Sequence, residues 1–237
     1  MFGDNCLQPN PAYTGPTLPV SMETHAEKHR QEGESFFQAM ERLTNRLGES
    51  DRHKLDLFDG LCDQRIIFGG RIQAAIGSRR RVTAFNCYVS DTLQDSLVDG
   101  DASIMQVAFD AAKTLSMGGG IGFDFSPLRP RNAIISGLGS TSSGAVSFMA
   151  IFNAVAKTIK SAGHRRAAMM GVLRVDHPDI EEFIKAKRNA DDLSDFNISV
   201  GVTDEFMHAV LSDSMFDLRH GGKVYKTIRA LDLWEQI

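Results

Sequence analysis

The sequence predicts an α/β fold in which a helical N-terminal region precedes strands and helices that alternate from about residue 80 onward. Apolar residues recur at helical spacing over 35–48 and again over 55–61, with no strand pattern between them. Later, short apolar runs such as "VTAFNCYV" and "MMGVLRV" alternate with stretches of helical spacing. Such alternation is typical of a parallel sheet or a barrel, and the pattern alone does not choose between them.

In the N-terminal region, residues 1–20 are rich in proline and glycine, which predicts an irregular arm. A helix is expected from Ser35 to Gly48, and a second over 55–61. The segment "IIFGGRIQAAIGS" (66–78) is expected to be a turn-rich crossing between layers.

The second part is expected to begin with a strand over 82–89 and a helix from Ser103. The elements expected after that helix are a strand (121–125), a loop (135–144), a helix (148–159), a strand (169–175), a helix (176–189), a strand (196–202), a helix (203–211), a hairpin around Gly221-Gly222 and a helix (226–237). In the helix over 176–189, Pro178 suits a first turn, and the acidic residues beside it complement the helix dipole. The last helix has no closing glycine, asparagine or proline, so we expect the chain to be the N-terminal piece of something longer.

Composition and charge exclude several classes of protein. The chain has 237 residues, of which 42% are hydrophobic and 24% charged, enough for a sizeable core. A net charge of -4 argues against a nucleic-acid-binding protein. No apolar run approaches the length of a membrane span, and "MFGDNCLQPNPAYTG" is no signal peptide. Three widely spaced cysteines predict reduced thiols and a cytoplasmic location.

The glycine run in "LSMGGGIGFDFSPLRP" is the first candidate site. It lacks the lysine and the Ser/Thr of a P-loop and follows a helix rather than opening one, so the Walker and dinucleotide-fold interpretations fit poorly. Two interpretations stay open for Gly119 and Gly120: a tight packing turn, or backbone that faces a ligand. Arg129 precedes a proline, which restricts its backbone to extended conformations, and its guanidinium suits phosphate.

A basic cluster in "IKSAGHRRAAMMG" is the second candidate. One interpretation is a solvated helix end that complements the dipole; the other is a loop that grips an anionic ligand. The cluster comprises Lys160, His164, Arg165 and Arg166.

Cysteine and histidine patterns are less informative. Cys87 lies mid-strand in "AFNCYV", where a lone cysteine is usually a small inert core residue, and Cys6 and Cys62 invite the same interpretation. No group of histidines has convincing metal-ligand spacing, so no metal site is expected.

Several segments together carry a resemblance to a known family. They are "LPVSMETHAEKHRQEGESF", "GGRIQAAIGS", "FNCYVSDTLQDSL", "MGGGIGFDFSPLRPR", "SSGAVSFMAIFNAV", "IKSAGHRRAAMMGVLRVDHPDIEEFIKAK" and "FNISVGVTDEFM". From about residue 18 to the end, the chain resembles the large catalytic subunit of ribonucleotide reductases, most closely the adenosylcobalamin-dependent class and its phage relatives. The resemblance implies an N-terminal arm and helical region over 1–75, followed over 76–237 by the first half of a ten-stranded α/β barrel.

The resemblance also implies a chemistry. The family removes the 2′-hydroxyl of a ribonucleotide through a protein thiyl radical, and two other cysteines give up electrons as they form a disulfide. Cys87, in "FNC", resembles the first of that reducing pair. Asn86 resembles a residue on the substrate side, and Gly119 and Gly120 resemble the backbone that lies against the ribose.

An allosteric site for deoxynucleotides is implied as well. Arg129 resembles the ligand of the effector phosphate, and Asp95 the acid that accepts from the effector's deoxyribose, with Asp91, Asp99 or Asp101 as alternatives. "GLGSTSSG" resembles the first specificity loop. "SAGHRRAA" resembles the second, which relays effector identity to the substrate base. The resemblance therefore implies effector-binding roles for Lys160, His164, Arg165 and Arg166.

The implied partners are a ribonucleotide substrate, a dNTP or ATP effector and a thioredoxin- or glutaredoxin-type reductant. The radical source would be adenosylcobalamin or a separate metal-containing subunit, and the location the cytoplasm, or the host cytoplasm for a phage protein. Two departures from the family pattern are Phe68 and Ala167. Nothing after Val200 resembles the strands with the thiyl cysteine, so the barrel's C-terminal half is expected in trans or lost. The alternative is an inactive nucleotide-binding fragment that needs a C-terminal partner chain.

Overall fold

The computed structural model describes residues 13, 15–137, 139–159, 168–188 and 193–237. It divides into two compact units, Met1–Asn86 and Cys87–Ile237, each with its own hydrophobic core. Within the described residues no helix is both long enough and apolar enough to cross a bilayer. The domain boundary predicted after residue 75 stays a prediction.

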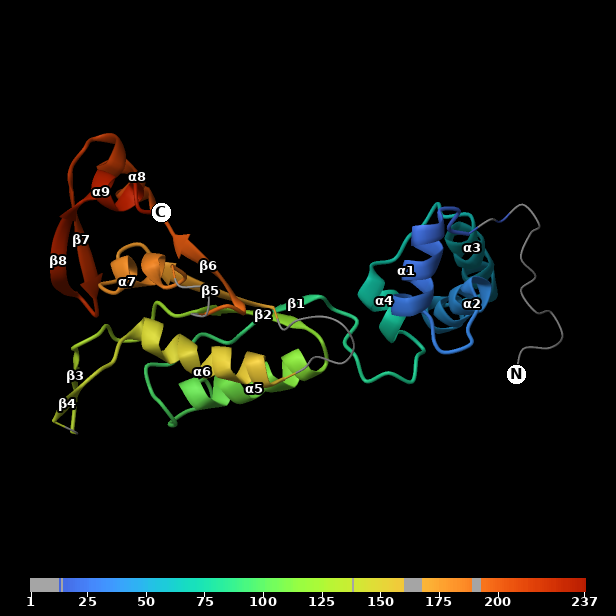
Figure 1. Cartoon of the computed structure of the whole chain (residues 1–237), viewed down its shortest axis with the longest axis horizontal. Helices are drawn as coiled ribbons and strands as arrows, with labels where there is room; N and C mark the ends of the chain where they lie inside the picture. The colour runs from blue at the N-terminus through green and yellow to red at the C-terminus, as the bar shows by residue number, and fades with distance from the viewer. Residues whose placement is uncertain (1–12, 14, 138, 160–167, 189–192) are drawn as a thin grey trace. The chain divides into compact units, whose positions relative to one another are not determined.

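The regular elements in the described part of the first unit are all helices, drawn from blue to teal in Figure 1. Its helices are α1 (Pro19–His29), α2 (Phe36–Leu47), α3 (Asp51–Cys62) and α4 (Gly70–Ala75). Ser35 and Gln38 form a capping box at the start of α2, and Gly48 is its C-cap, so the helix predicted between Ser35 and Gly48 is confirmed. The apolar faces of α2 and α3 supply the buried core of this unit.

Helix α4 overturns one prediction, because the segment over 66–78 is not simply a turn-rich crossing. A helix of six residues that begins with a glycine and follows another would not be stable in isolation. Tertiary hydrogen bonds stabilise it instead: the Arg42 guanidinium donates to the carbonyls of Gln73 and Ile76, at the C-terminal end of α4. No local pattern in the sequence signals such a bond.

The second unit is built on a four-stranded sheet in the order β1-β2-β5-β6, with every pair parallel. This confirms the predicted α/β fold with a parallel sheet. Its elements are β1 (Cys87–Val89), α5 (Ile104–Ser116), β2 (Gly120–Asp124), β3 (Ile134–Ile135), β4 (Ser140–Thr141), α6 (Ala145–Thr158), β5 (Met169–Arg174), α7 (Ile180–Lys185), β6 (Phe196–Gly201), α8 (Asp204–Leu211), β7 (Met215–His220), β8 (Lys223–Arg229) and α9 (Ala230–Trp234).

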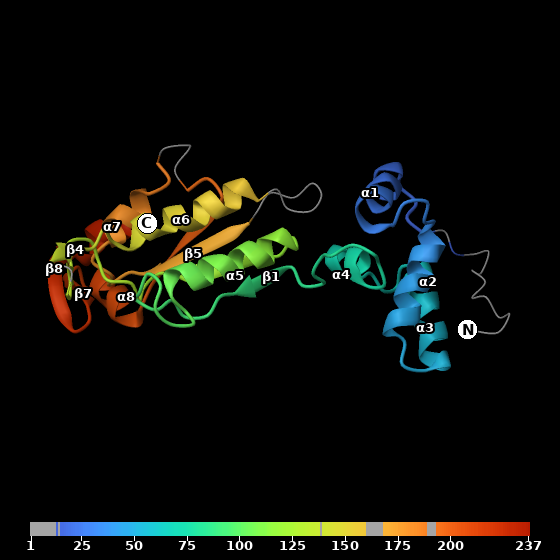
Figure 2. The same cartoon turned by 90° about the horizontal axis from the view of Figure 1, so that it is seen from below.

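Helices α5 and α6 lie side by side along the sheet (Figures 1 and 2). Between them and the strands, four fully buried phenylalanines contact one another with ring centroids 4.7–6.2 Å apart. They are Phe123, Phe125, Phe152 and Phe196. This core fixes the strand ends, and therefore the residues that flank them.

Two further predictions need correction. The helix expected over 226–237 begins only at Ala230, because Lys226–Arg229 extend β8 and pair antiparallel with Met215–Leu218. The β-branched Thr227 and Ile228 suit that strand. The loop expected over 135–144 contains a short antiparallel pair, β3 with β4, although Leu138 lies outside the described residues.

Candidate functional site

Cys87 begins β1, and its neighbour across the sheet is Gly120, the first residue of β2. The side chain of Cys87 is an exposed free thiol, and Asn86, directly before it, is exposed as well. The structure therefore brings together three residues predicted for one site: the cysteine, the asparagine and one glycine of the run. They lie where two parallel strands start.

The fold itself explains why two positions of the glycine run, Gly118 and Gly119, are glycine. Gly118 adopts a φ of 79°, which ends α5 in a conformation that side chains rarely allow. At Gly119, a Cβ atom would lie 2.9 Å from the ring of Tyr88 and 3.0 Å from Cγ2 of Thr114. A positive φ therefore accounts for Gly118, and close packing against other protein side chains accounts for Gly119.

Asp95 and Arg129 form a second group. The Arg129 backbone N–H donates to Asp95 Oδ1 over 3.1 Å, Nε donates to Oδ2 over 2.7 Å, and a terminal nitrogen donates to the Asp95 carbonyl over 3.2 Å. Of the acids considered for this role, Asp95 is the one that bonds to Arg129. About 30% of each side chain is exposed, so solvent and a ligand can reach the pair.

These two groups lie at opposite ends of the parallel strands. Cys87 and Gly120 are the first residues of β1 and β2, whereas Asp95 follows β1 and Arg129 follows β2. The basic cluster Lys160, His164, Arg165 and Arg166 lies outside the described residues. Its described neighbour Ala168 accepts a hydrogen bond from the backbone of Ile121, so the chain enters β5 at the Cys87 end of the sheet.

One buried acid near Arg129 was not recognised as a site residue in the sequence. Asp179 is only 6% exposed, and its carboxylate accepts from the backbone N–H of Arg131 and of Ala145. In the sequence it looked like an acid that complements the dipole of its own helix. The segment "DHPD", in which His177 and Asp179 flank a proline after a strand, is the sequence feature that could have pointed to Asp179.

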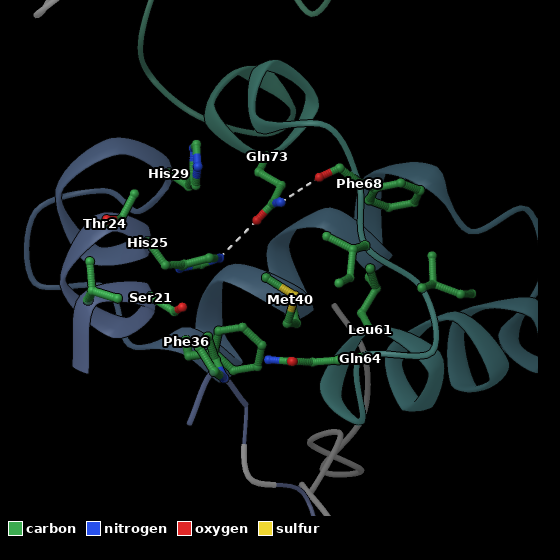
Figure 3. A pocket seen from close by; sticks show the side chains of 14 residues that line it. Ser21, Thr24, His25, His29, Phe36, Met40, Leu61, Gln64, Phe68 and Gln73 are labelled. Carbon is green, nitrogen blue, oxygen red and sulfur yellow. Dashed lines mark hydrogen bonds between the residues drawn. The ribbon is translucent and has the colours of Figure 1, made fainter. Parts of the chain in front are cut away.

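A cavity of about 380 Å³ lies in the helical unit (Figure 3). Its central polar pair is His25 and Gln73, joined by a 2.8 Å hydrogen bond, and Gln73 also donates to the Phe68 carbonyl. Arg30 Nε donates to His25 Nδ1, so the proton of the neutral ring lies on Nε2. Burial lowers the pKa of His25, which keeps the ring neutral. The pair is satisfied internally, and most of the remaining lining is apolar.

A second cavity, of about 240 Å³, lies where Ser126 and the end of β5 meet the β7–β8 turn. Arg174 bonds Asp176 with both Nε and a terminal nitrogen, and Arg219 Nε lies 3.7 Å from the same carboxylate. Burial, the largest single cause, would raise the pKa of Asp176, but the hydrogen bond and charge of Arg174, the residue's own backbone N–H and the charge of Arg219 together lower it. The cations here are therefore already partnered. Nowhere in the described part of the chain do three or more His, Cys, Asp or Glu side chains gather as a metal site would need.

Comparison with known proteins matches the sequence to one family. A family model for the ribonucleotide reductase barrel domain covers residues 85–234. The chain is 41% identical over 152 residues to the vitamin B12-dependent ribonucleoside-diphosphate reductase of Thermoplasma acidophilum, which covers 63% of this chain and 19% of that protein. Identity to the enzyme of the same name in Mycobacterium tuberculosis (strain CDC 1551 / Oshkosh) is 38% over 154 residues, covering 64% and 22%.

More distant is the ribonucleoside-diphosphate reductase subunit alpha of Helicobacter pylori (strain J99), at 33% over 141 residues, covering 56% and 17%. The chain thus spans about a fifth of the length of these curated relatives. The matched family model takes in the whole parallel sheet with its covering helices, which is more than half of the chain. The chain therefore belongs to the ribonucleotide reductase family, in its barrel domain.

Proposed function

We propose that the complete protein reduces ribonucleotides to deoxyribonucleotides by thiyl-radical chemistry, and that this chain supplies the helical region and the first strands of the barrel. The observation that carries the proposal is the exposed Cys87 thiol at the start of β1, opposite Gly120. Family membership and the names of the relatives support it. The same names favour the adenosylcobalamin-dependent type, class II.

Cys87 would act as one of two reducing thiols. Replacing the 2′-hydroxyl by hydrogen releases one water and requires two electrons and two protons. Two thiols supply both when they form one disulfide, which an external thioredoxin- or glutaredoxin-type dithiol then reduces by exchange. An exposed thiol is accessible to substrate and to the reductant in turn.

The substrate would lie along the start of β1 and β2. Asn86 is exposed and can donate or accept hydrogen bonds beside the thiol. Gly120, and Gly119 before it, would present backbone rather than side chain to the ribose, which allows a close approach. The packing of Gly119 on Tyr88 supports a rigid turn for this purpose.

A deoxynucleotide or ATP effector would bind near Arg129 and Asp95. The Asp95 bonds orient the guanidinium, and its remaining donors would bind a phosphate. Lys160, His164, Arg165 and Arg166 would add positive charge from the second loop. Because that loop leads into β5 beside Gly120, it is suited to relay effector identity to the substrate end.

The radical source would be adenosylcobalamin, or a separate metal-containing subunit in the alternative case. Adenosylcobalamin, when bound, supplies the radical that starts the reaction. We assign none of the described residues to hold it. Its site would belong to another part of the enzyme.

The test is to supply the C-terminal part of a reductase barrel, in trans or by fusion, with adenosylcobalamin and a dithiol, and to assay deoxyribonucleotide product. Product that requires both parts is expected. Effector binding without any product, under conditions where a relative is active, would favour the alternative of an inactive nucleotide-binding fragment.

Arg129→Ala should weaken dTTP binding by about 10- to 150-fold, because a charge-assisted hydrogen bond contributes about 1.5–3 kcal/mol. Arg129→Lys should restore little, since the planar fork is lost. Calorimetric titration of dTTP into the complemented enzyme measures this. Arg52→Ala, which removes an exposed guanidinium from α3, is the control. Equal affinities for wild type and Arg129→Ala would remove Arg129 from the effector site.

A further inference from the structure

The Asp179 carboxylate binds both ends of the loop that contains β3 and β4. Its Oδ1 and Oδ2 lie 3.0 and 3.1 Å from the backbone nitrogen of Arg131, and Oδ2 also accepts from Ala145 N over 2.9 Å. Arg131 leads into β3, and Ala145 is the first residue of α6 after β4. One buried carboxylate therefore binds the backbone on both sides of the β3–β4 pair.

The packing around this carboxylate is close. Gly144 has a φ of 90°, and a Cβ atom there would lie 2.7 Å from Asp179 Oδ2 and 2.9 Å from Arg131 Cβ. Ser142 Oγ accepts from Gly144 N, and its backbone bonds to Asn132 and Ala133. The two ends of the loop are thus fixed to each other and to Asp179, with no room for a side chain at Gly144.

Residues 177–182 also bond to the residues on either side of Arg129. His177 Nδ1 accepts from Asp179 N, so its other ring nitrogen carries the proton and donates to the Leu128 carbonyl over 2.9 Å. On the far side, the Arg131 guanidinium makes two bonds to Glu182, of 2.9 and 2.6 Å. Arg129 therefore lies between two backbone positions, Leu128 and Arg131, that both rest on residues 177–182.

We propose that Asp179 is a positioning residue for the effector site, which holds the backbone of Arg131 and so fixes the direction in which Arg129 meets the effector phosphate. The proposal rests on the effector role of Arg129 proposed above. Releasing the Arg131 backbone removes one of the anchors of the Leu128–Arg131 stretch, while the bonds from Arg129 to Asp95 and from Arg131 to Glu182 remain. The direction in which Arg129 meets the phosphate is then less fixed, although Arg129 does not touch Asp179.

Asp179→Asn tests this in the complemented enzyme, because the volume is kept while an NH₂ donor replaces one acceptor and faces backbone N–H groups. We expect dTTP binding to weaken by about 10-fold. Glu182→Gln loosens only the partly exposed ion pair with Arg131 and should weaken it by about 2- to 5-fold. Asp204→Asn, which changes an exposed acid in the first turn of α8, is the matched control.

The comparison of affinity with stability separates positioning from a purely structural role. A structural role would lower the melting temperature and leave the dTTP affinity of the folded protein unchanged, which would overturn the proposal. If Asp179→Asn does not fold, the dTTP affinity of Glu182→Gln is the deciding measurement. The proposal is refuted if that affinity lies within 1.5-fold of wild type (about 0.2 kcal/mol) while Arg129→Ala shows a clear loss. If Arg129→Ala has no effect either, the effector role itself fails, and this proposal with it.

Discussion

Replacing Cys87 by serine is expected to lower dithiol-dependent turnover of the complemented enzyme by at least about 100-fold, the lower end of the effect of a group that transfers a proton during the reaction. A serine keeps the size of the side chain but cannot form a disulfide, so the two electrons have no source. Deoxyribonucleotide formed per enzyme under multiple turnover is the measurement. The dissociation constant of the substrate should change little, because the substitution removes a group that reacts and not one that binds the substrate.

The control for Cys87 is Cys62, which is buried in α3. Burial and the nearby Asp59 and Asp63 raise the pKa of its thiol to about 12, so it stays protonated and unreactive. Alkylation with iodoacetamide at pH 8, in a Cys6→Ser background, should modify Cys87 well before Cys62. Cys62→Ala should retain turnover. Activity of Cys87→Ser close to wild type would exclude Cys87 from the reducing pair.

Arg42→Ala is expected to destabilise the helical unit by about 3–5 kcal/mol, the usual cost of removing one partner of a buried ion pair. Arg42 Nε lies 2.7 Å from Glu34 Oε1, and both side chains are only 10% exposed. The same guanidinium donates to the carbonyls of His29, Gln73 and Ile76. Burial alone would raise the pKa of Glu34, but hydrogen bonds from Arg42 and from Gln31 outweigh it and lower the pKa.

Hydrogen exchange of α2 peptides measures this effect for the helical unit by itself. Exchange should accelerate by at least about 100-fold in Arg42→Ala. The exchange rate of Arg42→Lys should lie between those of wild type and Arg42→Ala, because a lysine keeps the charge but cannot reach Glu34 and three carbonyls together. Arg46→Ala, an exposed position in the last turn of α2, should change stability by less than about 0.5 kcal/mol. Exchange rates of Arg42→Ala equal to those of Arg46→Ala would contradict the prediction.

The elements that could be predicted from the sequence are those that local chemistry determines. Ser35 and Gly48 delimit α2 because a hydroxyl cap and a glycine end act within a few residues. Helix α4 could not be predicted, since its stability comes from Arg42, about thirty residues away. Lys226–Arg229 had helical spacing, yet the partner strand at Met215–Leu218 decided their conformation.

The candidate site divides in the same way. Cys87 and Arg129 could be predicted as site residues from the sequence because each belongs to a short, distinctive segment, and their roles stay predictions. The register that sets Cys87 opposite Gly120 needed the fold, as did the choice of Asp95 over its neighbouring acids. Asp179 was missed because it binds backbone N–H groups, which leave no trace in residue type at Arg131 or Ala145.

The bonds of Asp179 also bear on the order in which the chain can fold during synthesis. The carboxylate follows Arg131 by 48 residues and Ala145 by 34. A ribosome that adds about 5–20 residues per second needs roughly 2–10 s to reach it after Arg131. During that interval the β3–β4 pair, α6 and β5 are made, while the carboxylate that accepts from the N–H groups of Arg131 and Ala145 does not yet exist. Asp179 can therefore bind the two ends of the loop only late in synthesis, because it is made after both of them.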